Sequence, residues 1–154
     1  MEYFREELFP CVSLTAVQTD KFKTGCMTAY LLTQLHRETA AENAVLPYVL
    51  RRGCTRLPDL EAIAAELDGL YGAHITPVVH KLGEIQAVGF EADFADDGAL
   101  GEEIFPRLAA DVADLLLHPN TRGGLLRPDI VDSEHTQLIA RIRAVLRRAE
   151  PAQT

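Results

Sequence analysis

The sequence predicts an α+β fold: a mainly antiparallel β-sheet in one layer, with helices packed on one of its faces in a second layer. Two observations carry this prediction. Some stretches alternate between apolar and other residues, as strands do, and others repeat apolar residues at helical spacing. These stretches follow one another as two strands, two helices, two strands and two helices, an order typical of a two-layer domain.

The first two strands are expected at residues 9–17 and 25–35. In the second stretch, both alternating sets of positions are fairly apolar, which favours an interior place in the sheet. The polar connection at residues 19–24 has the length of a hairpin loop. We therefore expect the two strands to pair with each other.

The first helix is expected after Thr39, because Thr39 and Glu42 have the spacing of a capping box. Gly53 follows the last apolar residues and is suited to a left-handed C-terminal cap. Pro47 lies inside this helix, where it removes one amide donor and favours a kink.

The remaining elements follow from the same periodicities. A helix from Pro58 to Gly72 carries an apolar stripe that includes Leu60, Leu70 and Tyr71. A hairpin is expected with its two strands at residues 73–80 and 84–94. A third helix is expected at residues 100–117 and a fourth at residues 128–149, followed by a frayed tail at residues 150–154.

Length and composition predict a single domain over residues 1–154. The 154 residues are 47% hydrophobic and 25% charged, which suits one ordinary core. The net charge of −8 argues against nucleic acid and anionic membranes as partners, because phosphates attract basic surfaces. One basic cluster, Arg141, Arg143, Arg147 and Arg148, lies near the end of the last helix, where it complements the helix dipole.

The same composition predicts a soluble, cytoplasmic protein. No apolar run approaches the roughly 20 residues that a membrane span needs. The first seven residues are charged and aromatic, unlike a signal peptide. Three widely spaced cysteines, an odd number, do not resemble a secreted disulfide framework.

Several segments together resemble the insulinase or pitrilysin family of zinc peptidases, especially its bacterial inactive-subunit members. They are residues 23–25, 29–32, 42–53, 57–60, 70–73, 83–90 and 131–135, and the resemblance covers roughly residues 10 to 148. It implies the metallohydrolase fold shared by insulinase-like and mitochondrial processing peptidases. It also implies an amino-terminal domain that is truncated relative to family members.

Active family members carry an H-x-x-E-H helix, in which two histidines bind zinc and the glutamate activates the metal-bound water. Aligned on Gly53, the five positions of this motif are Ala44, Val45, Leu46, Pro47 and Tyr48. Both histidines are absent and a proline replaces the general base. The resemblance therefore implies a protein that is not an enzyme and has no cofactor.

The family's third zinc ligand is a glutamate, and Glu134, between Ser133 and His135, fits that position. A lone carboxylate cannot supply the three protein ligands of a catalytic zinc, so we expect no metal. The alternative interpretation of Glu134 is a surface carboxylate near the start of its helix.

The other candidate side chains do not rebuild a site. His74 and His80 share a strand face, but six residues at about 3.3 Å each separate them by roughly 20 Å. His36 and His118 are expected at a loop and a helix end. Cys11 and Cys26 fall in predicted strands, where buried, inert thiols are usual, and nothing pairs a cysteine with a histidine base.

The resemblance implies a peptide-binding or scaffold subunit that pairs with a catalytic zinc peptidase. A sheet edge could add an extended peptide by backbone hydrogen bonds, either at the strand 25–35 or at the hairpin strand 84–94. Sequence does not choose between them.

Two other functions stay open. One is a metal-dependent hydrolase with a displaced site, built on Glu134 and His135. The other is a structural fragment that self-associates through an exposed apolar face of its last helix, formed by Leu138, Ile142 and Leu146.

Overall fold

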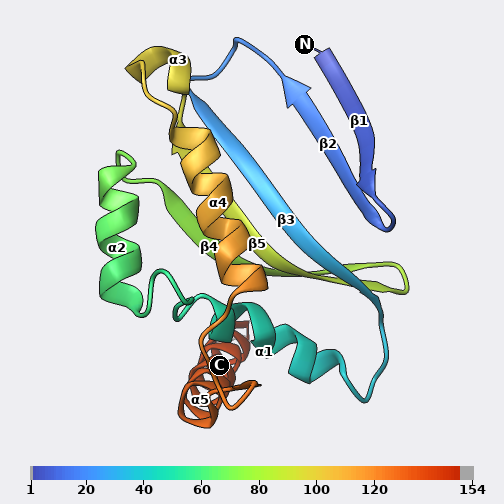
Figure 1. Ribbon diagram of the computed structural model, residues 1–154. Helices are drawn as coiled ribbons and strands as arrows, with labels where there is room; N and C mark the ends of the chain where they lie inside the picture. The colour runs from blue at the N-terminus through green and yellow to red at the C-terminus, as the bar shows by residue number, and fades with distance from the viewer. Residues whose placement is uncertain (1, 150–154) are drawn as a thin grey trace, which may run out of the picture.

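The computed structural model describes residues 2–149 of the protein (Figure 1). The frayed tail expected at residues 150–154 lies outside the described residues. The helices and strands of the described residues are, in order, β1 (Glu2–Phe9), β2 (Val12–Gln18), β3 (Thr24–Gln34), α1 (Ala40–Leu50), α2 (Leu60–Gly69), β4 (His74–Leu82), β5 (Ile85–Ala95), α3 (Asp97–Leu100), α4 (Ile104–Leu117), β6 (Thr121–Arg122), β7 (Leu125–Leu126) and α5 (Pro128–Ala149).

The body of the protein is a three-stranded antiparallel sheet in the order β3-β5-β4. Both α1 and α4 pack against β5 on one face of this sheet (Figure 1). Met27 and Ala29 of β3 pack toward the helices, whereas the alternate residues Thr28 and Tyr30 are exposed on the opposite face. The predicted α+β fold, with helices covering one face of an antiparallel sheet, is confirmed.

The core lies between the helices and the centre of this sheet. Phe90, in the middle strand β5, is completely buried and pairs with Ala29 on one side and Pro77 on the other. α4 contributes Ile104, Leu108, Val112 and Leu115 to this core, and Leu70, the residue after α2, is also deeply buried there. Burial of these apolar groups holds the helices on the sheet.

The structure corrects the predicted pairing at the start of the chain. β2 pairs with β1, a strand that the sequence pattern does not predict, and β3 pairs with β5. All residues of β1 and β2 are exposed, so β1 has no buried face to impose a clear alternation of apolar and polar residues. The two strands form a separate hairpin beside β3 (Figure 1).

The interior position expected for the second strand is also wrong. β3 is an edge strand, and its apolar residues on the helix-free face remain exposed: Tyr30 is 38% exposed and Leu32 is 65% exposed. Apolar residues on both faces of a strand indicate burial only when other elements cover both faces of its sheet. Here helices cover one face only.

The first helix begins where expected, but its ends form differently. Thr39 is the N-cap, yet its side chain makes no capping hydrogen bond, because its backbone is not in the extended conformation of a usual N-cap. Pro47 is fully buried inside α1. Gly53 has a φ of +149°, outside the left-handed helical region; an added Cβ would lie 2.6 Å from the Pro58 carbonyl oxygen. Gly53 is therefore not a left-handed cap, but close packing and a positive φ that residues with a Cβ rarely adopt both require glycine here.

The second helix is shorter than predicted. It begins after Asp59, whose side chain accepts a hydrogen bond from the amide of Ala62 at 2.8 Å. Leu60 is 40% exposed and Tyr71 is 53% exposed, contrary to their expected place on a buried stripe. Tyr71 lies beyond the helix with a φ of +57°, which turns its side chain away from the core.

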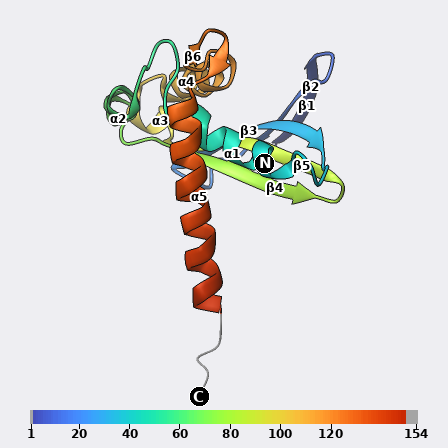
Figure 2. The ribbon, with the colours of Figure 1, turned by 90° about the horizontal axis from the view of Figure 1, so that it is seen from below.

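The later elements largely agree with the sequence pattern. The β4–β5 hairpin is confirmed and turns at Gly83, whose φ is +61°. The predicted third helix begins later than expected, at Ile104, because Gly101 adopts a left-handed conformation that ends the short helix α3 before it. The last helix, α5, is confirmed and extends away from the body (Figure 2). Among the described helices, none is both long and apolar enough to cross a membrane.

Candidate functional site

The five positions that the resemblance aligns with an H-x-x-E-H motif lie on α1. Val45 and Pro47 are buried, and Leu46 packs against the hydrophobic core. Ala44 and Tyr48, which the resemblance aligns with the two histidines of the motif, lie one turn apart and are half-buried. The Tyr48 ring lies beneath the guanidinium of Arg141, whose central carbon is 5.4 Å from the ring centroid. A cation–π contact therefore joins α1 to α5 at this point.

Glu134 is brought beside this helix because α5 packs against α1. It is only 5% exposed and accepts a hydrogen bond from Nη1 of Arg52 at 3.0 Å. The surface interpretation of Glu134 is therefore wrong. A carboxylate this buried needs a partner, and the Arg52 guanidinium provides both a positive charge and a donor.

A pocket of about 180 Å³ opens between α1, β4 and α5. Its lining consists of Tyr48, Arg51, Arg52, Leu60, Pro77, Glu134, Gln137 and Arg141. The Arg51 side chain crosses to β4 and donates from Nε to the carbonyl oxygen of Ile75 at 2.8 Å. Arg141 donates to the Gln137 side chain at 3.3 Å.

Sequence reasoning missed these arginines as site residues. Sequence reasoning gave no role to Arg51 or Arg52, and it expected Arg141 to complement the dipole of the last helix. Arg141 lies two turns before the end of α5, whereas the dipole acts within the last turn, where Arg147 and Arg148 lie. The sequence signal for this pocket was the pair of adjacent arginines after α1, and hydrophobic periodicity does not assign a role to such a pair.

The side chains at the motif do not fit a zinc ion. A methyl group, a pyrrolidine ring and a phenol stand at Ala44, Pro47 and Tyr48, where an active H-x-x-E-H helix has two imidazoles and a carboxylate. Glu134 is already engaged by Arg52. Within residues 2–149, no three His, Cys, Asp or Glu side chains gather closely enough to hold a metal ion.

The remaining candidate residues lie apart from the pocket. His74 and His80 are exposed on the helix-free face of the sheet, where His80 contacts the Tyr30 ring edge-on at 5.8 Å between centroids. His36 is exposed in the loop before α1. His135 is exposed while its neighbour Glu134 is buried, so the two do not form a joint site.

The cysteines differ from the expectation. Cys11, in the turn between β1 and β2, and Cys26, on β3, are both exposed, whereas Cys54 is buried. Burial and the neighbouring Asp93 raise the pKa of the Cys26 thiol, which lowers its thiolate fraction.

Comparison with known proteins agrees with a metallopeptidase-like fold. No protein-family model matches the chain. Over 149 residues, 94% of the chain, the sequence is 29% identical to the probable inactive metalloprotease YmfF of Bacillus subtilis (strain 168). The fold matches the crystal structure of a conserved protein from Enterococcus faecalis V583, with a TM-score of 0.86 over 96% of the chain at 20% identity. The chain spans about a third of the length of each, 35% in both cases.

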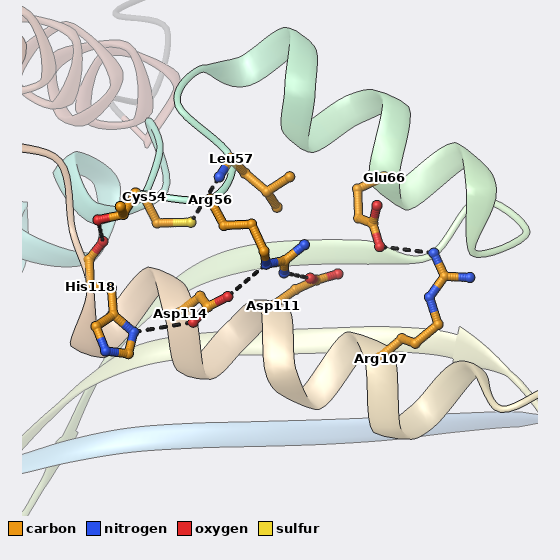
Figure 3. A network of polar contacts seen from close by, with 9 residues as sticks. Cys54, Arg56, Leu57, Glu66, Arg107, Asp111, Asp114 and His118 are labelled. Atoms are coloured by element: carbon orange, nitrogen blue, oxygen red, sulfur yellow. Dashed lines mark hydrogen bonds and ion pairs between the residues drawn. The ribbon is translucent and has the colours of Figure 1, made fainter.

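A second charged cluster lies outside the pocket, between the loop after α1 and α4 (Figure 3). Arg56 forms ion pairs with Asp111 and Asp114, and His118 pairs with Asp114 at 3.1 Å. Burial raises the pKa of Asp111 in spite of Arg56, whereas the hydrogen bond from Arg56 lowers the pKa of Asp114. This cluster joins the 51–57 segment to α4 and is structural.

Proposed function

We propose that this chain is a non-catalytic, zinc-free domain of an insulinase-like protein, which serves as a binding or scaffold subunit. One observation carries the proposal: the glutamate at the third-ligand position is buried in an ion pair with Arg52. An arginine cation stands beside the carboxylate that zinc would use. Binding zinc there would require breaking this pair and leaving Arg52 without its partner.

The relative from Bacillus subtilis supports the same proposal. Its name describes a probable inactive metalloprotease, and the match covers 94% of this chain, including the degenerate motif. The missing general base adds a chemical reason. Even a metal ion held by other ligands would lack the carboxylate that activates water in active family members.

The zinc-free proposal is tested by metal analysis and zinc titration of the purified chain, together with a peptidase assay. We expect substoichiometric zinc and no cleavage. Ala44→His/Pro47→Glu/Tyr48→His should also lack zinc-dependent proteolysis, because Glu134 remains paired with Arg52 and no surrounding groups orient the new imidazoles. Stoichiometric zinc that supports cleavage and disappears in Glu134→Ala, but not in the matched control His135→Ala, would contradict the proposal.

The sheet edges restrict how such a subunit could bind an extended peptide. β5 is the middle strand, so the hairpin strand at residues 84–94 cannot add a peptide. β4 is an edge, but near the pocket Pro77 has no amide donor and the Ile75 carbonyl is occupied by Arg51. β3, the other edge of the central sheet, contains no proline, which makes it the better edge for strand addition.

The partner proposed for this subunit is a catalytic chain with an intact H-x-x-E-H helix, encoded beside it. We expect the two chains to sediment together as a complex when mixed in equal amounts. Self-association is the competing result: Ile142 and Leu146 are 51% and 61% exposed on α5, as expected for an unpartnered apolar face, although Leu138 is half-buried. A mixture that sediments as two separate species would contradict the pairing.

A further inference from the structure

The pocket between α1, β4 and α5 concentrates positive charge on an acidic protein. Arg51, Arg52 and Arg141 line it, and Glu134 is its one acidic lining residue. The chain as a whole has a net charge of −8. Three guanidinium groups against one carboxylate therefore make this pocket a local site of attraction for an anion.

Each guanidinium is held in place by a contact that leaves other donors free. Arg51 uses Nε on the Ile75 carbonyl, Arg52 uses Nη1 on Glu134, and Arg141 uses Nη2 on Gln137. A guanidinium has five N–H donors, so one contact fixes its orientation and leaves further N–H groups available. Side chains that are already ordered lose little entropy when they bind a ligand.

The size and walls of the pocket restrict the ligand to a single anionic group. Its volume of about 180 Å³ is smaller than sites for whole drug-sized ligands, which are about 300–1,000 Å³. Tyr48, Leu60 and Pro77 supply apolar surface beside the arginines. A group that combines a short apolar stem with a planar anion, such as a carboxylate, matches both parts.

Backbone recognition at this point is weak, which favours recognition of a side chain or a chain end. The neighbouring stretch of β4 lacks the amide of Pro77, and its Ile75 carbonyl already accepts from Arg51. A peptide that reaches the pocket therefore gains little from strand addition to β4. Bidentate pairing with a guanidinium supplies the contact instead.

We propose that this pocket binds a peptide carboxylate, supplied by a free C-terminus or by an aspartate or glutamate side chain. The inference rests on the proposed function, because an arginine-lined pocket binds carboxylate only where no zinc occupies the former ligand positions. A carboxylate is thus the group by which the proposed binding subunit would recognise a polypeptide.

The test is a titration of the ¹⁵N-labelled chain with four N-acetylated tripeptides, two of which carry one carboxylate while the other two are neutral. Binding is monitored by NMR through the arginine Nε–H and backbone amide signals. The peptides are Gly-Gly-Leu with a free C-terminus, Gly-Gly-Leu amide, Gly-Glu-Gly amide and Gly-Gln-Gly amide. We expect at least one carboxylate peptide to bind about tenfold or more tightly than its neutral counterpart, as charged hydrogen bonds predict. The pair that shows the difference identifies the source of the carboxylate.

Arg141→Ala should weaken this binding about tenfold, and Arg141→Lys should weaken it less, because the charge remains while the bidentate geometry is lost. Arg143→Ala is the matched control, since Arg143 is exposed on the same helix and does not line the pocket. Equal affinity for the carboxylate and neutral peptides, or equal losses in Arg141→Ala and Arg143→Ala, would overturn the inference. Zinc analysis of the same sample separates this failure from failure of the proposed function.

Discussion

Replacing Arg56 by alanine is expected to lower the free energy of unfolding by about 2–3 kcal/mol at pH 7. The change leaves Asp111, which is 1% exposed, without its counter-charge; its Oδ2 atom already has no hydrogen-bond partner. Breaking a fully buried pair costs more, but the Arg56 side chain is 46% exposed, and solvent reduces the effect. Urea unfolding of the variant and the wild type measures the difference.

The destabilisation by Arg56→Ala should shrink as the pH falls. Burial already raises the pKa of Asp111, and loss of the guanidinium raises it further. Because a raised carboxyl pKa means that the folded state prefers the neutral acid, the unpaired Asp111 is unfavourable above that pKa and tolerated below it. The stabilisation from Asp114, whose pKa Arg56 lowers, likewise disappears on acidification. The difference in stability between the two proteins should therefore shrink as the pH falls from 7 toward about 4, where Asp111 becomes protonated, and shrink further below about 4, where Asp114 does.

Two further variants make the Arg56 experiment specific. Arg107→Ala removes another arginine of the same region, paired with Glu66 but 53% exposed, and should cost about 1 kcal/mol or less. Arg56→Met with Asp111→Leu should recover most of the lost stability, because it removes the buried charge together with its partner. An Arg56→Ala loss no greater than that of Arg107→Ala, or one independent of pH, would contradict the structural role of the cluster.

Gly89→Ala is expected to lower the free energy of unfolding by about 3 kcal/mol. Gly89 lies in the middle strand β5 and pairs with Tyr30 of β3, and an added Cβ would overlap the carbonyl oxygen of Ala29. Both groups belong to the paired strands, so the overlap is relieved only if β3 and β5 move apart. Chemical unfolding followed by far-UV circular dichroism measures this loss.

Gly69→Ala is the matched control for Gly89→Ala. Gly69 is the last residue of α2, and no atom lies within 4 Å of an added Cβ. Alanine is a better helix former than glycine, so this variant should be about 0.5–1 kcal/mol more stable than the wild type. Similar unfolding curves for the two variants would show that strand spacing does not determine the effect at Gly89.

The candidate site was predictable only where it depends on local sequence. The absence of histidine and glutamate at Ala44, Pro47 and Tyr48 follows from residue types and their spacing to Gly53. The burial of Glu134 beside that helix does not follow from sequence, because Arg52 and Glu134 are 82 residues apart. The arginine pocket depends on contacts among three such distant segments.

The amino-acid sequence by itself determined the α+β class, the positions of α1, α2 and α5, and the β4–β5 hairpin. These elements carry their own periodicity and turns, so nearby residues are enough to specify them. Only the tertiary structure decided that β2 pairs with β1, that β3 is an edge and that Arg51, Arg52 and Arg141 share one pocket. Strand partners and shared pockets depend on which distant surfaces are covered, and no local pattern encodes that coverage.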